Sequence, residues 1–221
     1  MIVVHHLNDS RSQRVLWLLE ELELPYEVAH YQRNPKTLLA PAELRSIHPL
    51  GKAPVLEDGA VRVAETGAIV DHLIEAHGQG RLRPERGTEE ARRYVYWTHY
   101  AEGSAMPPLL LNLVFAQLPK RVPALIRPLV RSISEKTQTS FVDPQIATHA
   151  DFWEASLAAS GWFAGDSFTA ADVMMSFPVE TAAARALDLA RYPNLATFLK
   201  AIHARPAYQR ALERGGAYAY A

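Results

Sequence analysis

Cysteine is absent from the 221 residues of this chain. Without cysteine, the protein has no disulfide and no thiol of its own that could act as a nucleophile or a redox pair. If sulfur chemistry takes place on this protein, the sulfur must therefore arrive on a substrate.

An excess of one charge and long apolar runs are also missing. The formal net charge is -1, whereas nucleic-acid-binding surfaces are usually basic, so we expect no nucleic-acid partner. No apolar run is long enough to span a bilayer, and the first six residues lack the charged and long apolar parts of a signal peptide. We therefore expect a cytoplasmic protein with no membrane partner.

The first eighty residues alternate short apolar segments with amphipathic ones. Strands are predicted at residues 2–7, 26–31, 54–56 and 60–63, and helices at 12–23, 41–46 and 66–77. This β-α-β-α-β-β-α order implies a mixed four-stranded sheet with helices on both faces. The first three elements form a parallel βαβ unit, and the Asp58-Gly59 turn closes an antiparallel hairpin.

The rest of the chain shows only helical patterns. We expect a first domain at residues 1–80, a linker at 81–87 and an all-helical domain at 88–221. Helices are predicted at about 88–117, 122–139, 144–160, 170–187 and 194–204, with a short one after Pro206. Thr169-Ala170-Ala171-Asp172 fits a capping box at the start of the fourth of these helices.

Residues 51–67 hold the most specific chemistry. Pro54 stands at a strand entrance, so Ala53-Pro54 is a candidate cis bond that leaves the backbone of Ala53 free to pair with a peptide-like ligand. Glu65-Thr66 offers helix-start N–H groups and a hydroxyl to a carboxylate, and a side-chain carboxylate to an ammonium. These groups predict a pocket for a small peptide with a free amino-acid end.

The loop that follows the first strand, residues 8–14, feeds the start of a helix, where anions and thiolates are stabilised. In the inferred sheet this loop and Ala53-Pro54 lie at the same end of adjacent strands. An elongated tripeptide can therefore run from Glu65-Thr66 past Ala53 to a thiol near Ser10, with Lys52 near its far carboxylate. Ser12, Arg11 and Asn8 are alternatives to Ser10 as the group that contacts the sulfur.

Several further motifs occur in a specific order. They are Ser10-Arg11-Ser12 with Arg14 before Leu16-Trp17-Leu18-Leu19-Glu20-Glu21-Leu22, His48-Pro49-Leu50-Gly51-Lys52-Ala53-Pro54-Val55-Leu56, Glu65-Thr66-Gly67-Ala68-Ile69, the Thr169-Asp172 capping box, Tyr192-Pro193-Asn194-Leu195 and Arg205-Pro206-Ala207-Tyr208. In these motifs the chain resembles the cytosolic glutathione S-transferases over essentially its whole length. Ser10-Arg11-Ser12 and residues 100–107 resemble a serine-type bacterial or fungal subgroup.

The resemblance implies a thioredoxin-like domain that binds glutathione as co-substrate, with a cis Ala53-Pro54 bond, followed by a helical domain. It implies that Glu65 and Thr66 bind the γ-glutamyl end, Ala53 the cysteinyl backbone and Lys52 the glycine carboxylate. Ser10 resembles the serine whose hydroxyl donates a hydrogen bond to the sulfur and favours the thiolate.

The implied activity is conjugation of the glutathione thiolate to hydrophobic electrophiles by a homodimer, with reduction of organic hydroperoxides as an additional activity. The second substrate is expected between the domains, against residues Tyr100, Glu102, Ser104, Met106 and Leu110. Glutathione-dependent isomerisation or dehalogenation, and a non-catalytic scaffold that binds glutathione or other ligands, remain as alternative functions.

The histidines show no metal-ligand spacing in the sequence. His72 and His77 lie five residues apart, off a common helical face. We therefore predict no metal.

Overall fold

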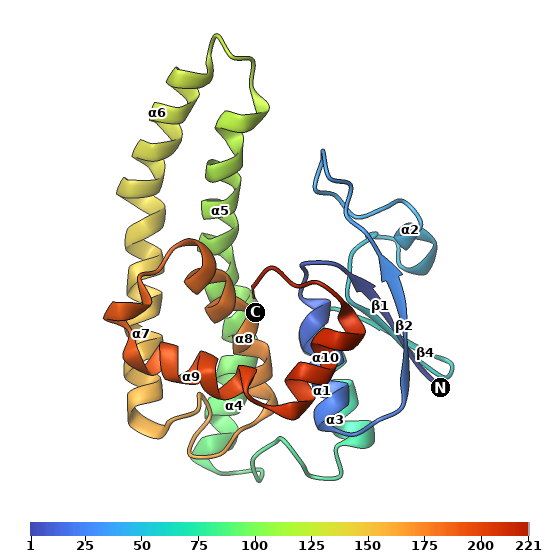
Figure 1. Ribbon diagram of the computed structural model, residues 1–221. Coiled ribbons are helices and arrows are strands. Elements are labelled where there is room, and N and C mark those ends of the chain that lie inside the picture. The colour runs from blue at the N-terminus through green and yellow to red at the C-terminus, as the bar shows by residue number, and fades with distance from the viewer. Residues whose placement is uncertain (221) are drawn as a thin grey trace.

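The N-terminal part of the chain forms a mixed sheet (Figure 1). The computed structural model describes residues 1–220. In this part of the chain the strands β1 (Ile2–Leu7), β2 (Tyr26–Tyr31), β3 (Val55–Asp58) and β4 (Val61–Ala64) lie in the order β2-β1-β3-β4. β1 is parallel to β2, and β3 is antiparallel to both β1 and β4. The predicted pairing, and the hairpin turn at Asp58-Gly59, are confirmed.

Helices α1 (Ser12–Glu21), α2 (Leu44–Ile47) and α3 (Thr66–His77) complete this part of the molecule. α1 and α3 pack on each other, and each contacts the sheet. The apolar stripe of α1 is buried because Val15, Leu18 and Leu19 recur at helical spacing on one side. The order β-α-β-α-β-β-α confirms the expected thioredoxin-like arrangement.

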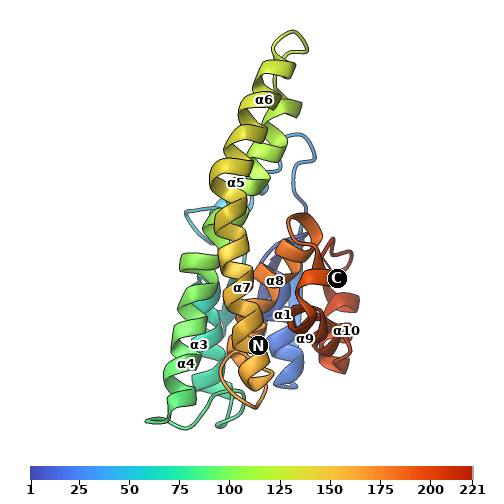
Figure 2. The same cartoon turned by 90° about the vertical axis from the view of Figure 1, so that its left-hand side faces the viewer.

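The remaining described residues form a helical bundle. Its helices are α4 (Glu89–Tyr100), α5 (Met106–Gln117), α6 (Arg127–Thr137), α7 (Asp143–Ser160), α8 (Ala170–Arg185), α9 (Pro193–His203) and α10 (Pro206–Gly215). α5 and α6 extend beyond the rest of the molecule in both views (Figures 1 and 2). None of the helices within residues 1–220 is both long and apolar enough to cross a bilayer.

Two predicted helices differ from the structure. The predicted helix at residues 88–117 is divided by a π-helical turn, Ala101–Ala105, between α4 and α5. The predicted helix at residues 122–139 begins only at Arg127, after a 3-10 turn at Leu118–Arg121. Val122 is extended, with φ -109° and ψ 156°, because a following proline disfavours the helical conformation.

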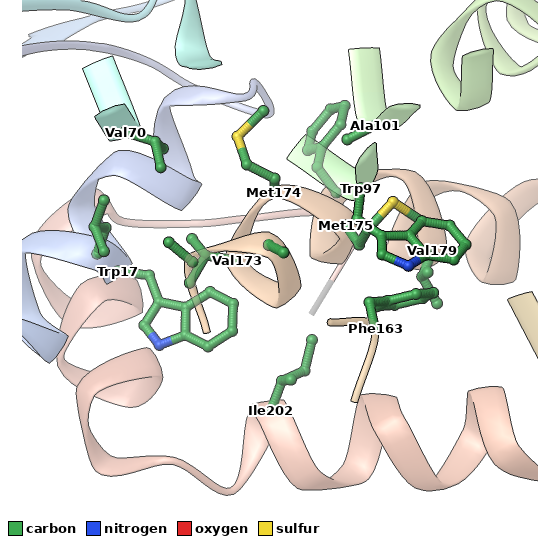
Figure 3. Packing of buried hydrophobic residues seen from close by; sticks show 14 of the residues in the cluster. Trp17, Val70, Trp97, Ala101, Phe163, Val173, Met174, Met175, Val179 and Ile202 are labelled. Atoms are coloured by element: carbon green, nitrogen blue, oxygen red, sulfur yellow. The ribbon is translucent and has the colours of Figure 1, made fainter. Parts of the chain in front are cut away.

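α8 occupies the centre of a core that the two halves of the molecule share. Every residue from 170 to 182 is buried. α8 contacts α1 and α3 on one side, and α4, α5 and α9 on the other. Figure 3 shows Val173 and Met175 of α8 between Trp17 of the sheet domain and Trp97 of the bundle. The bundle therefore holds α1 in place, and with it the loop that carries the predicted sulfur site.

Candidate active site

The loop between β1 and α1 holds two buried serine hydroxyls. Asp9 has a φ of 48°, and the chain then turns through Ser10 and Arg11 into α1. Ser10 is 4% exposed and Ser12 is fully buried, and their Oγ atoms lie 2.7 Å apart. The backbone N–H of Ser12 donates to Ser10 Oγ at 3.2 Å. The hydroxyl of Ser10 therefore sits at the helix start, held by its own loop.

A histidine continues this hydrogen-bond chain into the protein. Ser12 Oγ lies 2.9 Å from His6 Nδ1, and the backbone N–H of Leu7 donates to Ser12 Oγ at 3.2 Å. Burial lowers the pKa of His6 to about 4, and the nearby His30 acts in the same direction. The contact with the Gly215 backbone acts to raise this pKa, but its effect is smaller. His6 is therefore neutral at pH 7. Nδ1 of His6 thus faces the Ser12 hydroxyl, which also lies 3.2 Å from the Leu7 carbonyl, and the Gly215 backbone contacts the same imidazole.

The pKa of His6 predicts a pH-dependent stability. The unfolded chain takes up this proton near pH 6.5 and the folded chain only near pH 4, so acidification favours unfolding. Between pH 6.5 and 4 we expect His6 to remove about 3 kcal/mol from the free energy of unfolding. Urea denaturation of wild type and His6→Asn across this range measures the difference. Burial raises the pKa of Asp172 to about 6, which gives the opposite slope in both proteins and cancels in the difference. Parallel curves would contradict the prediction.

The backbone of the predicted peptide site lies at the same end of the sheet. The Ala53-Pro54 bond is cis, as the sequence predicted. Val55, the first residue of β3, pairs with His5 near the end of β1. The Ser10 loop and Ala53 therefore lie at the same end of two adjacent strands. Lys52 is exposed beside them.

Glu65 and Thr66 begin α3. Glu65 has a φ of 70° and a ψ of 125°, a left-handed region that non-glycine residues rarely occupy and that occurs frequently at functional sites. Its side chain is exposed, whereas Thr66 is buried. Burial lowers the pKa of Arg11, whereas the negative charges of Glu102 and Glu65 act to raise it. Arg11 is therefore close enough to both carboxylates to interact with them electrostatically. The structure therefore brings the starts of α1 and α3 together.

Glu102, a predicted second-substrate residue, connects the two halves of the molecule. One carboxylate oxygen pairs with Arg14 of α1, and the other lies 3.0 Å from Nε of Arg11. Arg14 is only 1% exposed and also donates to the carbonyl of Met174 in α8 at 2.6 Å. Burial acts to raise the pKa of Glu102, but Arg14 and Arg11 outweigh burial and lower it. Sequence reasoning missed this ion pair because its partners are 88 residues apart.

The other predicted second-substrate residues fall into two groups. Ser104 and Leu110 are exposed, whereas Tyr100 and Met106 are buried. The Tyr100 hydroxyl bonds His149 Nδ1 and accepts from Trp153 Nε1 at 3.1 Å, both on α7. Tyr100 therefore points its polar end into the bundle, and the structure does not bring it to the surface beside Ser104.

The C-terminal segment lies against the Ser10 loop. The backbone N–H of Ala219 donates to Asp9 Oδ1 at 2.9 Å, and the hydroxyl of Tyr218 donates to Glu180 Oε2 at 2.7 Å. Gly215, at the end of α10, is the residue whose backbone contacts His6. The carboxylate of Asp9 is thus occupied by the C-terminal segment.

A third polar cluster corrects the expectation for the histidines. His72 and His77 both direct Nε2 at the same oxygen of Asp58, at 3.0 and 2.7 Å. The inference that their spacing separates them is wrong, because Asp58 at the hairpin turn lies between the two rings. The signal in the sequence is Asp58-Gly59, because the turn that it forms also carries the carboxylate.

Comparisons with known proteins identify the family that this chain resembles. The sequence matches the family described as "Glutathione S-transferase, N-terminal domain" over residues 1–75, and "Glutathione S-transferase, C-terminal domain" over residues 118–206. It is 34% identical to glutathione S-transferase 3 of Schizosaccharomyces pombe, over 97% of this chain and 88% of that protein. It is 30% identical to glutathione S-transferase 1 of Saccharomyces cerevisiae, over 98% of this chain and 96% of that protein. The crystal structure of a glutathione S-transferase from Actinobacillus pleuropneumoniae superposes with a TM-score of 0.80 at 33% identity, covering 99% of this chain and 94% of that one.

Proposed function

Because the chain belongs to the glutathione S-transferase family, we propose that it is a serine-type glutathione transferase in which the Ser10 hydroxyl stabilises the glutathione thiolate. The observation that carries the proposal is the place of Ser10. Ser10 is 4% exposed and lies just before α1, at the end of the sheet where Ala53-Pro54 also lies. Because the chain has no cysteine, the reactive sulfur is that of glutathione.

The energy required of this site is modest. A free thiol has a pKa of about 8.5, so few molecules are ionised at neutral pH. Lowering the pKa by about two units takes about 2.7 kcal/mol of preferential thiolate stabilisation. A hydrogen bond to a charged group contributes about 1.5–3 kcal/mol and a helix N-terminus about 0.3–1 kcal/mol. The Ser10 hydroxyl at the start of α1 is thus sufficient.

The hydroxyl acts as a donor and keeps its proton. In the present arrangement the hydroxyls of Ser10 and Ser12 share a hydrogen bond, with their Oγ atoms 2.7 Å apart, and the Ser12 N–H donates to the Ser10 oxygen. A bound thiol loses its proton to solvent, and the Ser10 O–H donates to the resulting thiolate. A lone pair of the sulfur then forms the carbon–sulfur bond with the electrophile. In the same step the carbon releases a leaving group with its bonding electrons or, at an activated double bond, the displaced electron pair takes a proton from water. Ser12, which is fully buried, positions Ser10 and does not contact the sulfur.

The other groups of glutathione bind at the same end of the sheet. Glu65 and the first N–H groups of α3 bind the α-ammonium and α-carboxylate of the γ-glutamyl end, with the Thr66 hydroxyl beside them. The Glu65 side chain is exposed and its backbone has a φ of 70°, and both observations support this role. The N–H and C=O of Ala53, before Pro54, pair with the cysteinyl backbone. Lys52 is exposed and binds the glycine carboxylate.

The second substrate is a hydrophobic electrophile. It lies beside the thiolate against the π-helical turn and the start of α5, where Ser104 and Leu110 are exposed. Met106 and Tyr100 form the buried wall behind this surface, and Glu102 fixes its edge through Arg11.

The working form is a cytoplasmic homodimer. Exposed apolar side chains on α5 and α6 support association of two chains, because such patches are uncommon on monomers. They include Leu111, Val114, Leu129 and Ile133. Sedimentation equilibrium measures the association, and a monomer at micromolar concentration would contradict it.

Substitution of Ser10 tests the proposed function. In Ser10→Ala we expect the pKa of the bound glutathione thiol, followed by thiolate absorbance, to rise by about 1–2 units, because the hydrogen bond is lost and the helix N-terminus remains. At a pH below both pKa values the thiolate fraction, and with it kcat/KM for conjugation, is then expected to fall by about 10- to 100-fold. Retention on immobilised glutathione should persist, because the peptide contacts remain.

Ser12→Ala is the matched control. It removes the partner of Ser10 but leaves the Ser10 hydroxyl free to donate, so we expect the thiol pKa to stay low. An unchanged titration in Ser10→Ala would remove Ser10 from its role, and a raised pKa in Ser12→Ala alone would assign that role to Ser12. No retention of wild type on glutathione would contradict the glutathione site itself.

A further inference from the structure

Three metal-ligand side chains converge at the opposite end of the sheet domain. Asp58 is the last residue of β3, at the turn to β4, while His72 and His77 lie in the second half of α3. One carboxylate oxygen, Oδ2, lies 3.0 Å from His72 Nε2 and 2.7 Å from His77 Nε2. The ligand atoms of all three residues lie within 4.8 Å of one another. Both imidazoles thus aim the same nitrogen at one point.

We propose that Asp58, His72 and His77 form a binding site for a divalent metal ion of the zinc type. Two imidazole nitrogens and one carboxylate oxygen are the protein ligands of many zinc sites, and they also suit cobalt, nickel and copper. Magnesium and calcium prefer oxygen ligands throughout. This inference replaces the expectation of no metal that the histidine spacing had suggested.

The distances are compatible with such an ion. Zinc binds nitrogen at about 2.0–2.1 Å and carboxylate oxygen at about 2.0–2.2 Å, so tetrahedral ligand atoms lie roughly 3.3–3.5 Å apart. The two N···O separations of 2.7 and 3.0 Å therefore need to open by roughly half an ångström. The rings meet edge to face, with centroids 6.2 Å apart, so a small rotation of each ring opens the space between them.

Solvent access and nearby charges also favour the site. The three side chains are 20–29% exposed, so an ion can enter from water while the ligands keep defined positions. On the same helix Glu75 pairs with Arg83 at 3.1 Å and with Arg86 at 3.7 Å, so these two arginines are engaged away from Asp58. Two neutral imidazoles and one carboxylate leave a single positive charge on the bound ion, and the fourth position is open to water.

The site is separate from the thiol site. α3 begins at Thr66, beside the glutathione site, and ends at His77, which a rise of 1.5 Å per residue places about 16 Å away. A bound ion joins the end of α3 to the β3–β4 hairpin. Because the unfolded chain does not hold these ligands together, binding stabilises the folded protein. The inference does not depend on the proposed role of Ser10.

Zinc titration of the untagged protein tests the inference. We expect calorimetry with zinc chloride to give one bound ion per protein chain, and calorimetry with magnesium chloride to give no binding. At a zinc concentration about 100 times Kd we expect Tm to rise by about 5–10 °C. Cobalt should give the intense visible absorption of a tetrahedral ion rather than the weak bands of an octahedral one.

Single substitutions provide the comparison. His72→Ala, His77→Ala and Asp58→Asn should each weaken zinc binding by at least about tenfold, which at the same zinc concentration reduces the Tm shift by about half or more. His99→Ala, which removes an exposed histidine of α4, should bind zinc as wild type does. Glutathione conjugation by the variants without zinc should be unchanged and reports that they are folded. Equal zinc binding by the His72→Ala/His77→Ala double variant, or no Tm shift in wild type, would overturn the proposal and leave Asp58 as a hydrogen-bond acceptor only.

Discussion

Replacing Glu102 with alanine is expected to lower the free energy of unfolding by about 3–5 kcal/mol, the usual cost of removing one partner from a buried ion pair. The cause is Arg14, which is 1% exposed and has Glu102 as its charge partner. Without that carboxylate the guanidinium keeps the Met174 carbonyl, at 2.6 Å, and the face of the Phe177 ring, but its charge has no carboxylate to balance it. Urea denaturation at fixed chain concentration measures the loss.

Two further variants separate the buried charge from other effects. Arg14→Met combined with Glu102→Leu should cost less than Glu102→Ala alone, because no unpaired charge remains in the core. Arg11→Ala should cost under about 1 kcal/mol, because the Arg11 side chain is 38% exposed and its pairing with Glu102 is screened by water. Equal losses in Glu102→Ala and Arg11→Ala would show that the buried pair has no special weight.

Replacing Asp172 with alanine is expected to cost about as much, about 3–5 kcal/mol. Asp172 is fully buried at the start of α8 and accepts the backbone N–H of Phe163 and of Thr169, each at 2.8 Å. Alanine leaves both N–H groups buried without a partner, at about 1–3 kcal/mol each, and the bond from the Thr169 N–H is the half of the capping box that Asp172 supplies. Denaturation at pH 7, where Asp172 is ionised, measures the change.

The neighbouring cap residue provides the matched control. Thr169→Ala removes one side-chain cap at the same helix start but leaves both acceptors of Asp172 in place, so about 1 kcal/mol is expected. Asp172→Asn keeps the shape and one acceptor oxygen and should fall between the two. A loss below about 1 kcal/mol in Asp172→Ala would show that water replaces the lost acceptors.

The order of strands and helices could be predicted because it follows from local patterns. The apolar stripe of α1, the Asp58-Gly59 turn and the Thr169–Asp172 capping box each act within a few residues, so the sequence specifies them directly. The late start of α6 at Arg127 is the exception. There Pro123 keeps Val122 extended and delays the start of the helix, whereas Pro128 lies in the first turn of α6.

Contacts between distant segments could not be predicted in the same way. Periodicity gives the apolar side of a helix but not which polar residue on its edge meets another element. Tyr100 therefore points into the bundle, toward His149 and Trp153, although its spacing equally allowed the surface. His72 and His77 converge only because the hairpin places Asp58 between them.

The position of the C-terminal segment has a consequence for synthesis. The loop between β1 and α1 and the strand before it are contacted by residues far along the chain, since the backbone of Gly215 contacts His6 and the N–H of Ala219 donates to Asp9. The ribosome adds each of these partners more than 200 residues after the residue that it contacts. The loop therefore acquires its last hydrogen-bond partners only after α10 has been synthesised.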